Sequence, residues 1–315
     1  MSWLKKKFRT KPLKASNINF SYGKHKILDN FSLTIKHNQV LSVVGQSGEG
    51  KSTFLHLISG AMTDSYKGKI KIHGFSRSLA KRDIGFVPQE VSLIPDLSIK
   101  DNLIFFGSLN NMSAKRAQTK GKELMKLMQL DVEDSRLPSE LSGGQKVRLN
   151  IIVSLLHSPK VLILDEPFVG LDYHNRKILW HFLKHQKNRK KTVILTTHLL
   201  VEAEHHCDRI VLLKKGRVFA SGKLEDLRNK LDAEYICELK TKYLSKSNNA
   251  EMLKYCENHN ITMMDRFDNY LMLSVQTIGA RNYFLKFLDK LGVDYEEIGF
   301  REPNLDELFL KVKNQ

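Results

Sequence analysis

Residues 45–53 read Gly45-Gln-Ser-Gly-Glu-Gly-Lys-Ser-Thr53 and fit the pattern G-x-x-x-x-G-K-[ST]. Its glycines let backbone N–H groups converge on an anion without a Cβ clash, and a following helix adds its positive N-terminal end. Residues 39–44 form a short apolar run that predicts a buried strand before the loop, and the mostly apolar residues 54–58 predict a helix after it. Strand, loop and helix in this order predict a nucleoside-triphosphate site in an α/β domain.

A second apolar run, residues 161–164, ends in Asp165 and Glu166. Magnesium bound to phosphates needs an oxygen-rich shell, and we therefore assign Asp165 and the hydroxyl of Ser52 to Mg²⁺. An attacking water needs a base, and we assign that role to Glu166. Lys51 is expected to reach the β- and γ-phosphates.

Between these two halves, residues 141–145 read Leu141-Ser-Gly-Gly-Gln145. Small residues at a helix N-terminus form a second anion site, which one ATP cannot easily use within the same monomer. With this pentapeptide, roughly residues 15–225 resemble the ATP-binding subunits of ABC transporters. The resemblance implies a head-to-tail dimer, of identical or different subunits, that holds two ATP molecules between its halves.

The resemblance also implies roles for residues that carry little signal alone. Gln89 is expected near Mg²⁺ or the water, His198 in Thr196-Thr-His198 as the family's switch histidine, and Tyr22 as the ring that stacks on adenine. The predicted catalytic residues are Glu166, His198 and Gln89, and the predicted metal ligands are Ser52, Gln89 and Asp165. The predicted ATP-binding residues are Tyr22, Gly45, Gln46, Ser47, Gly48, Glu49, Gly50, Lys51, Ser52, Thr53, Ser142, Gly143, Gly144 and Gln145.

Two positions depart from the family pattern. Val169 stands where the family often has a hydroxyl or small residue, in a loop that contacts the opposite subunit. Glu49 places an acid inside the phosphate loop, and we expect its side chain to point away from the phosphates.

The remaining pattern predicts an α/β fold in two parts. Residues 1–231 are expected to form a P-loop ABC ATPase domain with a mainly parallel sheet, an antiparallel β subdomain and an inserted helical subdomain at about 98–158. Strands are predicted at residues 27–35, 69–73, 84–87, 161–164, 193–196, 210–213 and 218–221.

Residues 232–315 predict a small α+β accessory domain with the order βαββαβ, which suggests a ferredoxin-like fold. The last segment places Leu305, Leu308, Phe309 and Val312 on one helical face. Residues 302–310, Glu302-Pro-Asn-Leu-Asp-Glu-Leu-Phe-Leu310, resemble the closing motif of ATPase subunits in drug, antibiotic and bacteriocin exporters, the daunorubicin-resistance-like group, as do residues 88–106. A generic amphipathic C-terminal helix is the alternative.

The charge, the apolar runs and the cysteines of the sequence narrow the class of protein further. The 315 residues carry a formal net charge of +17, and no apolar run approaches the roughly 20 residues of a membrane span. A solvated surface, an anionic membrane face and nucleic acid all fit the charge, but no nucleic-acid recognition module accompanies it, so nucleic acid is not expected. Cys207, Cys237 and Cys256 lack C-x-x-C spacing, which indicates a reducing cytosol. The basic residues gather in two runs, at Lys5, Lys6, Lys7, Arg9, Lys11 and Lys14 and at Lys187, Arg189, Lys190 and Lys191.

These observations together predict an ATP-hydrolysing subunit that is cytoplasmic, peripheral on the inner face of the membrane, and powers export through separate permease chains. Residues 90–106 are the predicted permease contact. An ATPase that acts on ribosomes or nucleic acid and the ATPase of an importer are the alternatives. The single set of motifs argues against the first, and the closing motif argues against the second. The cargo, homo- or heterodimer, and the role of the C-terminal domain stay open.

Overall fold

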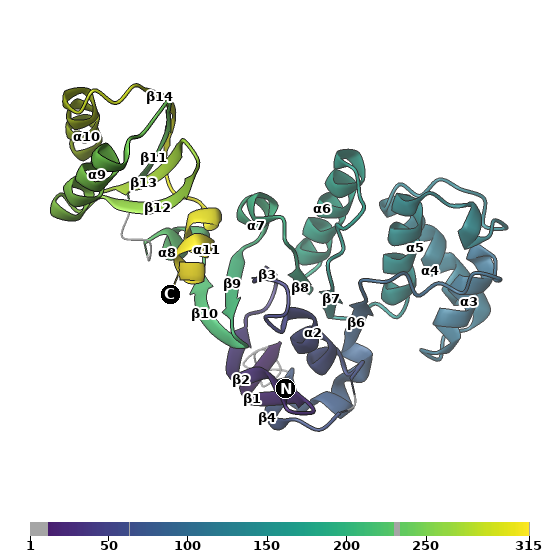
Figure 1. Cartoon of the computed structure of the whole chain (residues 1–315). Helices are drawn as coiled ribbons and strands as arrows, with labels where there is room; N and C mark the ends of the chain where they lie inside the picture. The colour runs from purple at the N-terminus through teal and green to yellow at the C-terminus, as the bar shows by residue number, and fades with distance from the viewer. Residues whose placement is uncertain (1–11, 63, 230–233, 315) are drawn as a thin grey trace. The chain divides into compact units, whose positions relative to one another are not determined.

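The structure, a computed structural model, describes residues 12–62, 64–229 and 234–314. The chain separates into two compact units, Met1–Ser221 and Gly222–Gln315 (Figure 1). The domain boundary expected between residues 231 and 232 lies outside the described residues and stays a prediction.

A six-stranded sheet in the order β10-β9-β3-β8-β7-β6 forms the centre of the first unit. The pairs from β9 through β6 are all parallel. Val161 and Ile163 pack into one hydrophobic core, whereas Leu162 and Leu164 pack into another on the opposite face. Burial on both faces explains why these strands read as continuous apolar runs. The strands are β3 (Val40–Val44), β6 (Ile84–Val87), β7 (Val161–Leu164), β8 (Thr192–Thr196), β9 (Arg209–Lys214) and β10 (Arg217–Gly222).

An antiparallel sheet in the order β2-β1-β4-β5 packs around helix α2 (Lys51–Ser59). The helix contributes Phe54, whose ring lies 4.4 Å from that of Phe31 in β2. This sheet and α2 share one core with one face of the central sheet. Its strands are β1 (Leu13–Tyr22), β2 (His25–Ile35), β4 (Lys67–Ile72) and β5 (Phe75–Ser76), and a 3-10 helix, η1 (Arg77–Asp83), follows.

Helices cover the other face of the central sheet. The helical subdomain holds α3 (Ile99–Ser108), α4 (Ala114–Leu127), the short η2 (Pro138–Glu140) and α5 (Gly143–Leu155). Helix α6 (Tyr173–Asn188) lies beside it, and α7 (Leu200–His206) lies on the other side of α6 (Figure 1). Ser113 caps α4, because its side chain accepts a hydrogen bond from the Arg116 N–H. Buried Arg148 of α5 donates to the carbonyls of Met128 and Gln129 and so fastens the end of α4.

The second unit has the predicted βαββαβ order, and its antiparallel sheet runs β12-β13-β11-β14. Two helices, α9 and α10, bury Met252, Cys256, Phe284 and Leu288 against one sheet face. Helix α11 contacts α8 and β12, with Leu305 and Leu308 buried; the side chains of Phe309 and Val312 lie outside the described set. The elements are α8 (Leu224–Arg228), β11 (Tyr235–Thr241), α9 (Lys246–Asn258), β12 (Thr262–Phe267), β13 (Tyr270–Val275), α10 (Ile278–Lys290), β14 (Tyr295–Arg301) and α11 (Leu305–Asn314).

No helix within the described ranges combines the length and the apolar character needed to cross a bilayer. The predicted α/β architecture, with its helical insertion and ferredoxin-like unit, is confirmed.

Candidate nucleotide site

The phosphate loop connects β3 to α2 at the carboxyl edge of the central sheet. Gly48 and Gly50 have φ values of 84° and 93°, in the left-handed region that favours glycine. A Cβ on Gly50 would lie 2.9 Å from Leu28 Cδ2. Glycine at these positions therefore lets the loop turn tightly at the N-terminus of α2, where backbone N–H groups and the helix dipole favour an anion.

Lys51 and Ser52 begin the helix and face the site. The buried ammonium of Lys51 donates to the carbonyls of Gly45 and Gln46, each at 2.9 Å. Burial lowers the pKa of Lys51, and the nearby acids Glu166, Asp165 and Glu49 oppose that shift. The ammonium therefore lies among both loop carbonyls and carboxylates.

Asp165 follows β7 directly and is buried. Its Oδ1 accepts hydrogen bonds from the Ser52 hydroxyl at 3.1 Å and from the Thr196 hydroxyl at 2.6 Å. The Nε2 of His56 lies 3.8 Å from Oδ2. A carboxylate and a hydroxyl held this close form an oxygen donor set suited to Mg²⁺.

Glu166 has a strained backbone and a buried side chain. Its φ is 47°, and its N–H donates to Thr196 Oγ1 at 2.8 Å. Strain at a non-glycine residue of this kind is frequent at functional sites. Burial raises the pKa of Glu166, Lys51 opposes the shift, and Asp165 adds to it. Glu166 is therefore a base that binds its proton more tightly than an exposed glutamate does.

His198 lies against the same carboxylate. Its Nε2 is 2.9 Å from Glu166 Oε1. Burial lowers the pKa of His198, the ammonium of Lys51 adds to that shift, and Asp165 opposes it. The ring is therefore predominantly neutral near pH 7 and has one nitrogen that donates and one that accepts.

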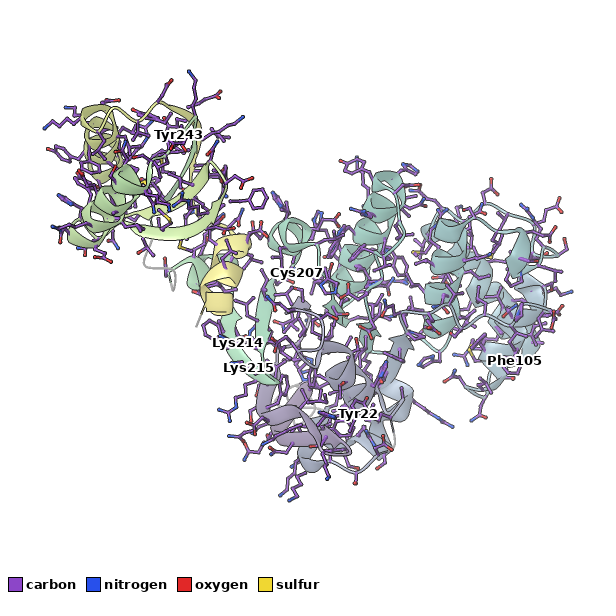
Figure 2. The ribbon with its side chains drawn as sticks, in the orientation of Figure 1. Tyr22, Phe105, Cys207, Lys214, Lys215 and Tyr243 are labelled. Carbon is purple, nitrogen blue, oxygen red and sulfur yellow. The ribbon has the colours of Figure 1, made fainter. Side chains whose placement is uncertain are left out.

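A pocket of about 380 Å³ brings most of the predicted residues together. Tyr22, labelled in Figure 2, lines this pocket and is half-exposed. Its ring lies edge-on to that of Phe20. Ile27 and Val169 also line it, and neither was among the predicted nucleotide-binding residues. The predicted residues in the lining are Tyr22, Ser47, Gly48, Gly50, Lys51, Ser52, Thr53, Gln89, Glu166 and His198.

The predicted residues Ser142, Gly143, Gly144 and Gln145 do not line this pocket. Ser142 caps α5: its hydroxyl accepts from the Gln145 N–H at 3.3 Å, and Gln145 Oε1 accepts from the Ser142 N–H at 2.9 Å. A Cβ on Gly144 would lie 2.7 Å from Asn175 Nδ2, but one on Gly143 would meet nothing within 4 Å. Gly143 therefore presents an open helix end outside its own chain's nucleotide pocket.

Glu49 turns away from the phosphate side of its loop. Its carboxylate accepts a hydrogen bond from the backbone N–H of Lys215, in the turn between β9 and β10 (Figure 2). Gly45, Gln46 and Glu49 are the three phosphate-loop residues that do not line the pocket.

Thr196 is a polar residue of this site for which sequence reasoning gave no role. Its hydroxyl bridges Asp165 and the Glu166 backbone, 31 and 30 residues earlier in the chain. The available signal was a polar residue that ends the apolar run Val193, Ile194, Leu195.

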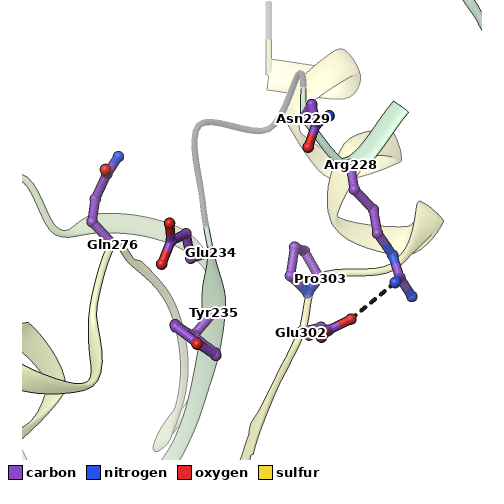
Figure 3. A pocket seen from close by; sticks show the side chains of 7 residues that line it. All are labelled: Arg228, Asn229, Glu234, Tyr235, Gln276, Glu302 and Pro303. Atoms are coloured by element: carbon purple, nitrogen blue, oxygen red, sulfur yellow. Dashed lines mark hydrogen bonds and ion pairs between the residues drawn. The ribbon is translucent and has the colours of Figure 1, made fainter. Parts of the chain in front are cut away.

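A larger pocket, of about 540 Å³, lies in the second unit (Figure 3). An ion pair of 3.0 Å between Arg228 and Glu302 crosses it. Among the described residues, its lining has no glycine-rich loop and no acid at the end of a buried strand, so these residues lack the elements that bind a triphosphate. The other lining residues are Asn229, Glu234, Tyr235, Gln276 and Pro303.

The fold and the smaller pocket define a phosphate-loop nucleoside triphosphatase with an inserted helical subdomain. The family profile described as ABC transporter matches residues 28–169. The linearmycin resistance ATP-binding protein LnrL of Bacillus subtilis (strain 168) is 29% identical over 309 residues, which are 95% of this chain and 97% of the relative. The Nod factor export ATP-binding protein I of Rhizobium etli is 34% identical over 220 residues, 69% of each chain.

A solved structure has the same fold. The dimeric structure of MJ0796, a bacterial ABC transporter cassette, is 29% identical, with a TM-score of 0.60 over 67% of this chain and 98% of that one. The chain belongs to the ATP-binding subunits of ABC transporters, and it is an ATP-binding ATPase.

Proposed function

We propose that this chain hydrolyses MgATP with Glu166 as the general base. The observation that carries the proposal is the buried cluster in which Thr196 binds Asp165 and the Glu166 N–H, while Asp165 also accepts from Ser52. Ser52, Asp165 and Gln89 would hold Mg²⁺, which when bound neutralises charge on the β- and γ-phosphate oxygens.

Each side chain of the site has a different role in the proposed hydrolysis. Lys51 balances phosphate charge from a buried position, where a charge interacts more strongly than in water. Glu166 takes the proton of the attacking water, and the adjacent ring of His198 orients that water and the γ-phosphate. Tyr22 stacks on adenine at the rim of the pocket.

We infer that the working unit is a head-to-tail dimer. Gly143 and Gly144 begin α5, and their backbone N–H groups have no carbonyl within the helix to which they can donate a hydrogen bond. These groups lie outside the pocket of their own chain, which supports their use by the ATP of a second subunit. Val169, which is 56% exposed beside the pocket, would contact that subunit.

Export is the direction of transport that the relatives support. One relative is named for linearmycin resistance and another for Nod factor export. We propose that this chain likewise powers export through separate membrane permease subunits, from the cytoplasmic face of the membrane. Residues 90–106 are the proposed permease contact, where Val91 is exposed. Phe105 is exposed as well (Figure 2).

The decisive experiment replaces Glu166 by Gln. E166Q should bind ATP and accumulate as a closed dimer, with hydrolysis reduced by about 100-fold or more, because the amide cannot accept the proton. Glu133 is an exposed acid whose side chain forms no ion pair within the described residues, so E133Q is the matched control and should retain wild-type hydrolysis. Unimpaired steady-state hydrolysis by E166Q would exclude Glu166 as the base.

A second measurement addresses the transport partner. The full chain, purified from membranes in mild detergent, should retain a polytopic membrane protein. Recovery of nucleic acid in place of a membrane protein would favour an ATPase that acts on ribosomes or nucleic acid and has no role in transport.

A further inference from the structure

The outer face of the antiparallel sheet carries four lysines. Alternation along β1 and β4 buries Leu13, Ala15, Ile70 and Ile72 on the inner face. The opposite face therefore presents the exposed side chains that alternate with them. These include Lys14 of β1 and Lys67, Lys69 and Lys71 of β4, and we call this set the lysine face.

The register places these charges together. Lys14 lies directly opposite Lys71, and Lys69 and Lys67 lie opposite Ser16 and Asn19. Like charges in directly opposed positions destabilise a sheet. The fold therefore maintains an unfavourable arrangement on an exposed face.

No acid within the described residues relieves it. Among these residues, no carboxylate oxygen lies within 4.0 Å of the ammonium nitrogen of any of the four lysines, so none of them forms an ion pair. The one acid in the four strands of this sheet, Asp29, is bound by Lys26 and Arg217. A partner from outside the chain is therefore the available source of compensating charge.

The second basic run of the sequence is different. Lys187 pairs with Asp208, and Arg189 Nη1 lies 3.6 Å from Glu123 Oε1. Two of the four charges in this run are therefore paired within the fold, whereas none of the four lysines of the lysine face is paired among the described residues, so the lysine face is the better candidate for an external anion.

The charge is also unevenly divided between the two units. Residues 222–315 contain 14 Lys and Arg against 16 Asp and Glu, whereas residues 1–221 contain 37 against 18. The first unit thus carries the whole excess of positive charge. The potential of this unit attracts anionic partners, and among the described residues no lysine of the lysine face has an ion-pair partner.

We propose that the lysine face binds the anionic headgroup surface of a membrane. The face is the surface of a sheet, and its alternating lysines are point charges on long flexible stems, which suit a fluid array of headgroups. Its neighbouring residues Ser16, Asn19, Ser32 and Thr34 are polar and uncharged. Single-stranded nucleic acid is usually held by aromatic stacking, and no ring is among these outer residues.

This inference deepens the proposed function, because it assumes a working place beside a membrane. The test of lipid binding requires neither a permease subunit nor ATP hydrolysis. Failure of lipid binding would therefore leave ATP hydrolysis and export intact, and failure of export would not affect the lipid result.

The test is co-sedimentation of the full chain with vesicles of phosphatidylcholine, with and without phosphatidylglycerol. Wild type should bind only the anionic vesicles and lose binding as salt rises from about 0.1 M to about 1 M, where the screening length falls from about 10 Å to about 3 Å. K67Q/K69Q/K71Q should partition about 100-fold less, since each basic residue near an anionic leaflet contributes about fivefold.

A control variant with the same change in net charge is K115Q/K126Q/K177Q. These lysines are exposed on α4 and α6 and have no ion pair within the described residues. The control should bind anionic vesicles within a few fold of wild type. Equal losses in both variants would mean that net charge alone governs binding, and that would overturn the assignment to this face.

Two other results also overturn it. Lysines near a sheet edge can act to prevent aggregation. If K67Q/K69Q/K71Q self-associates but binds vesicles like wild type, the lysines protect the edge and do not bind lipid. If RNA or an acidic protein displaces wild type but not the triple variant, while vesicles bind both equally, the partner is that polyanion.

Discussion

At the scale of single residues, Thr196 offers a sharp test of the site. T196V preserves shape but removes the hydroxyl that donates to Asp165 and accepts from the Glu166 N–H. We expect kcat to fall about 10- to 100-fold and the Mg²⁺ concentration for half-maximal activity to rise, as for other residues that orient metal ligands. T196S keeps the hydroxyl and should stay close to wild type. Wild-type kcat and Mg²⁺ dependence in T196V would show that the bridge is not needed.

Lys191 gives a prediction about pH. Burial lowers its pKa to about 8, Lys120 and Arg189 add to the shift, and Glu123 opposes it. A lowered pKa means that the amine loses its proton at lower pH, so its acylation should reach half-maximal rate near pH 8, against about 10.4 for an ordinary lysine. Trace labelling with acetic anhydride and mass spectrometry would measure this midpoint, with exposed Lys115 as an internal reference. K120Q should raise the midpoint, and a midpoint above about 10 in wild type would contradict the prediction.

Residue roles were predictable where they depend on local chain geometry. The phosphate loop was identified because its residues are consecutive and its glycines meet a local demand for positive φ at Gly48 and Gly50. The Thr196 bridge was missed because Asp165 and Thr196 meet only when β7 and β8 pair in parallel. The roles assigned to Gln89 and His198 came from family resemblance, and their positions in one pocket with Glu166 support those roles.

At the scale of elements, the closing motif, residues 302–310, holds helix α11 against the sheet of the second unit. Arg301 of β14 donates to Glu238 of β11 and to Glu307 of α11, at 2.7 Å in each case. Glu307 is fully buried and also accepts from the Asn304 N–H at 2.6 Å. The motif therefore fastens α11 to the sheet through charge-assisted hydrogen bonds.

Removing Glu307 should loosen this unit. Loss of one partner from a buried pair costs about 3–5 kcal/mol, and we expect about 2–3 kcal/mol for E307A because solvent screens part of the Arg301 charge. Hydrogen exchange in the full chain should rise in α11 and β14. E302Q removes a more exposed acid of the same motif and should change stability by less than about 0.5 kcal/mol. Equal protection of α11 in E307A and wild type would show that its apolar contacts suffice.

Strand β1 is an element that alternation did not predict. Leu13 and Ala15 are buried in one phase, and Ile18 and Phe20 in the other, because a bulge at Asn17, with φ of 52°, shifts the register. A strict two-residue period cannot follow a strand through such a bulge. Strands without one, such as β6 and β7, have the predicted bounds.

At the scale of the whole molecule, charge separates the two units, and the sequence total of +17 concealed this division. Only the compact boundary at Ser221 shows that the acidic excess belongs to one unit and the basic excess to the other. The nucleotide site would have a similar property in the dimer that we propose, because no single chain would contain all of it. Ser142 to Gln145 carry the motif, but their own chain's pocket does not include them.

A shared site can be tested with two inactive variants. K51A removes the ammonium of the phosphate loop, and G143E adds a carboxylate where the partner's triphosphate is expected. G143E should fold, because a Cβ there meets no atom within 4 Å and an acid in the first turn suits the helix dipole. Each variant alone should lose most ATPase activity while keeping its thermal stability within a few degrees of wild type.

Mixing the two variants then distinguishes a shared site from a self-contained one. In a mixed dimer one site combines the intact phosphate loop of G143E with the intact helix end of K51A, and the other site carries both defects. Random pairing makes half of the dimers mixed, each with one intact site of two, so the mixture should recover up to about a quarter of wild-type turnover. The recovered activity should fall on dilution as dimers separate. If each chain encloses its own ATP, no mixture can rebuild a working site, and activity will stay at the level of the separate variants at every ratio and concentration.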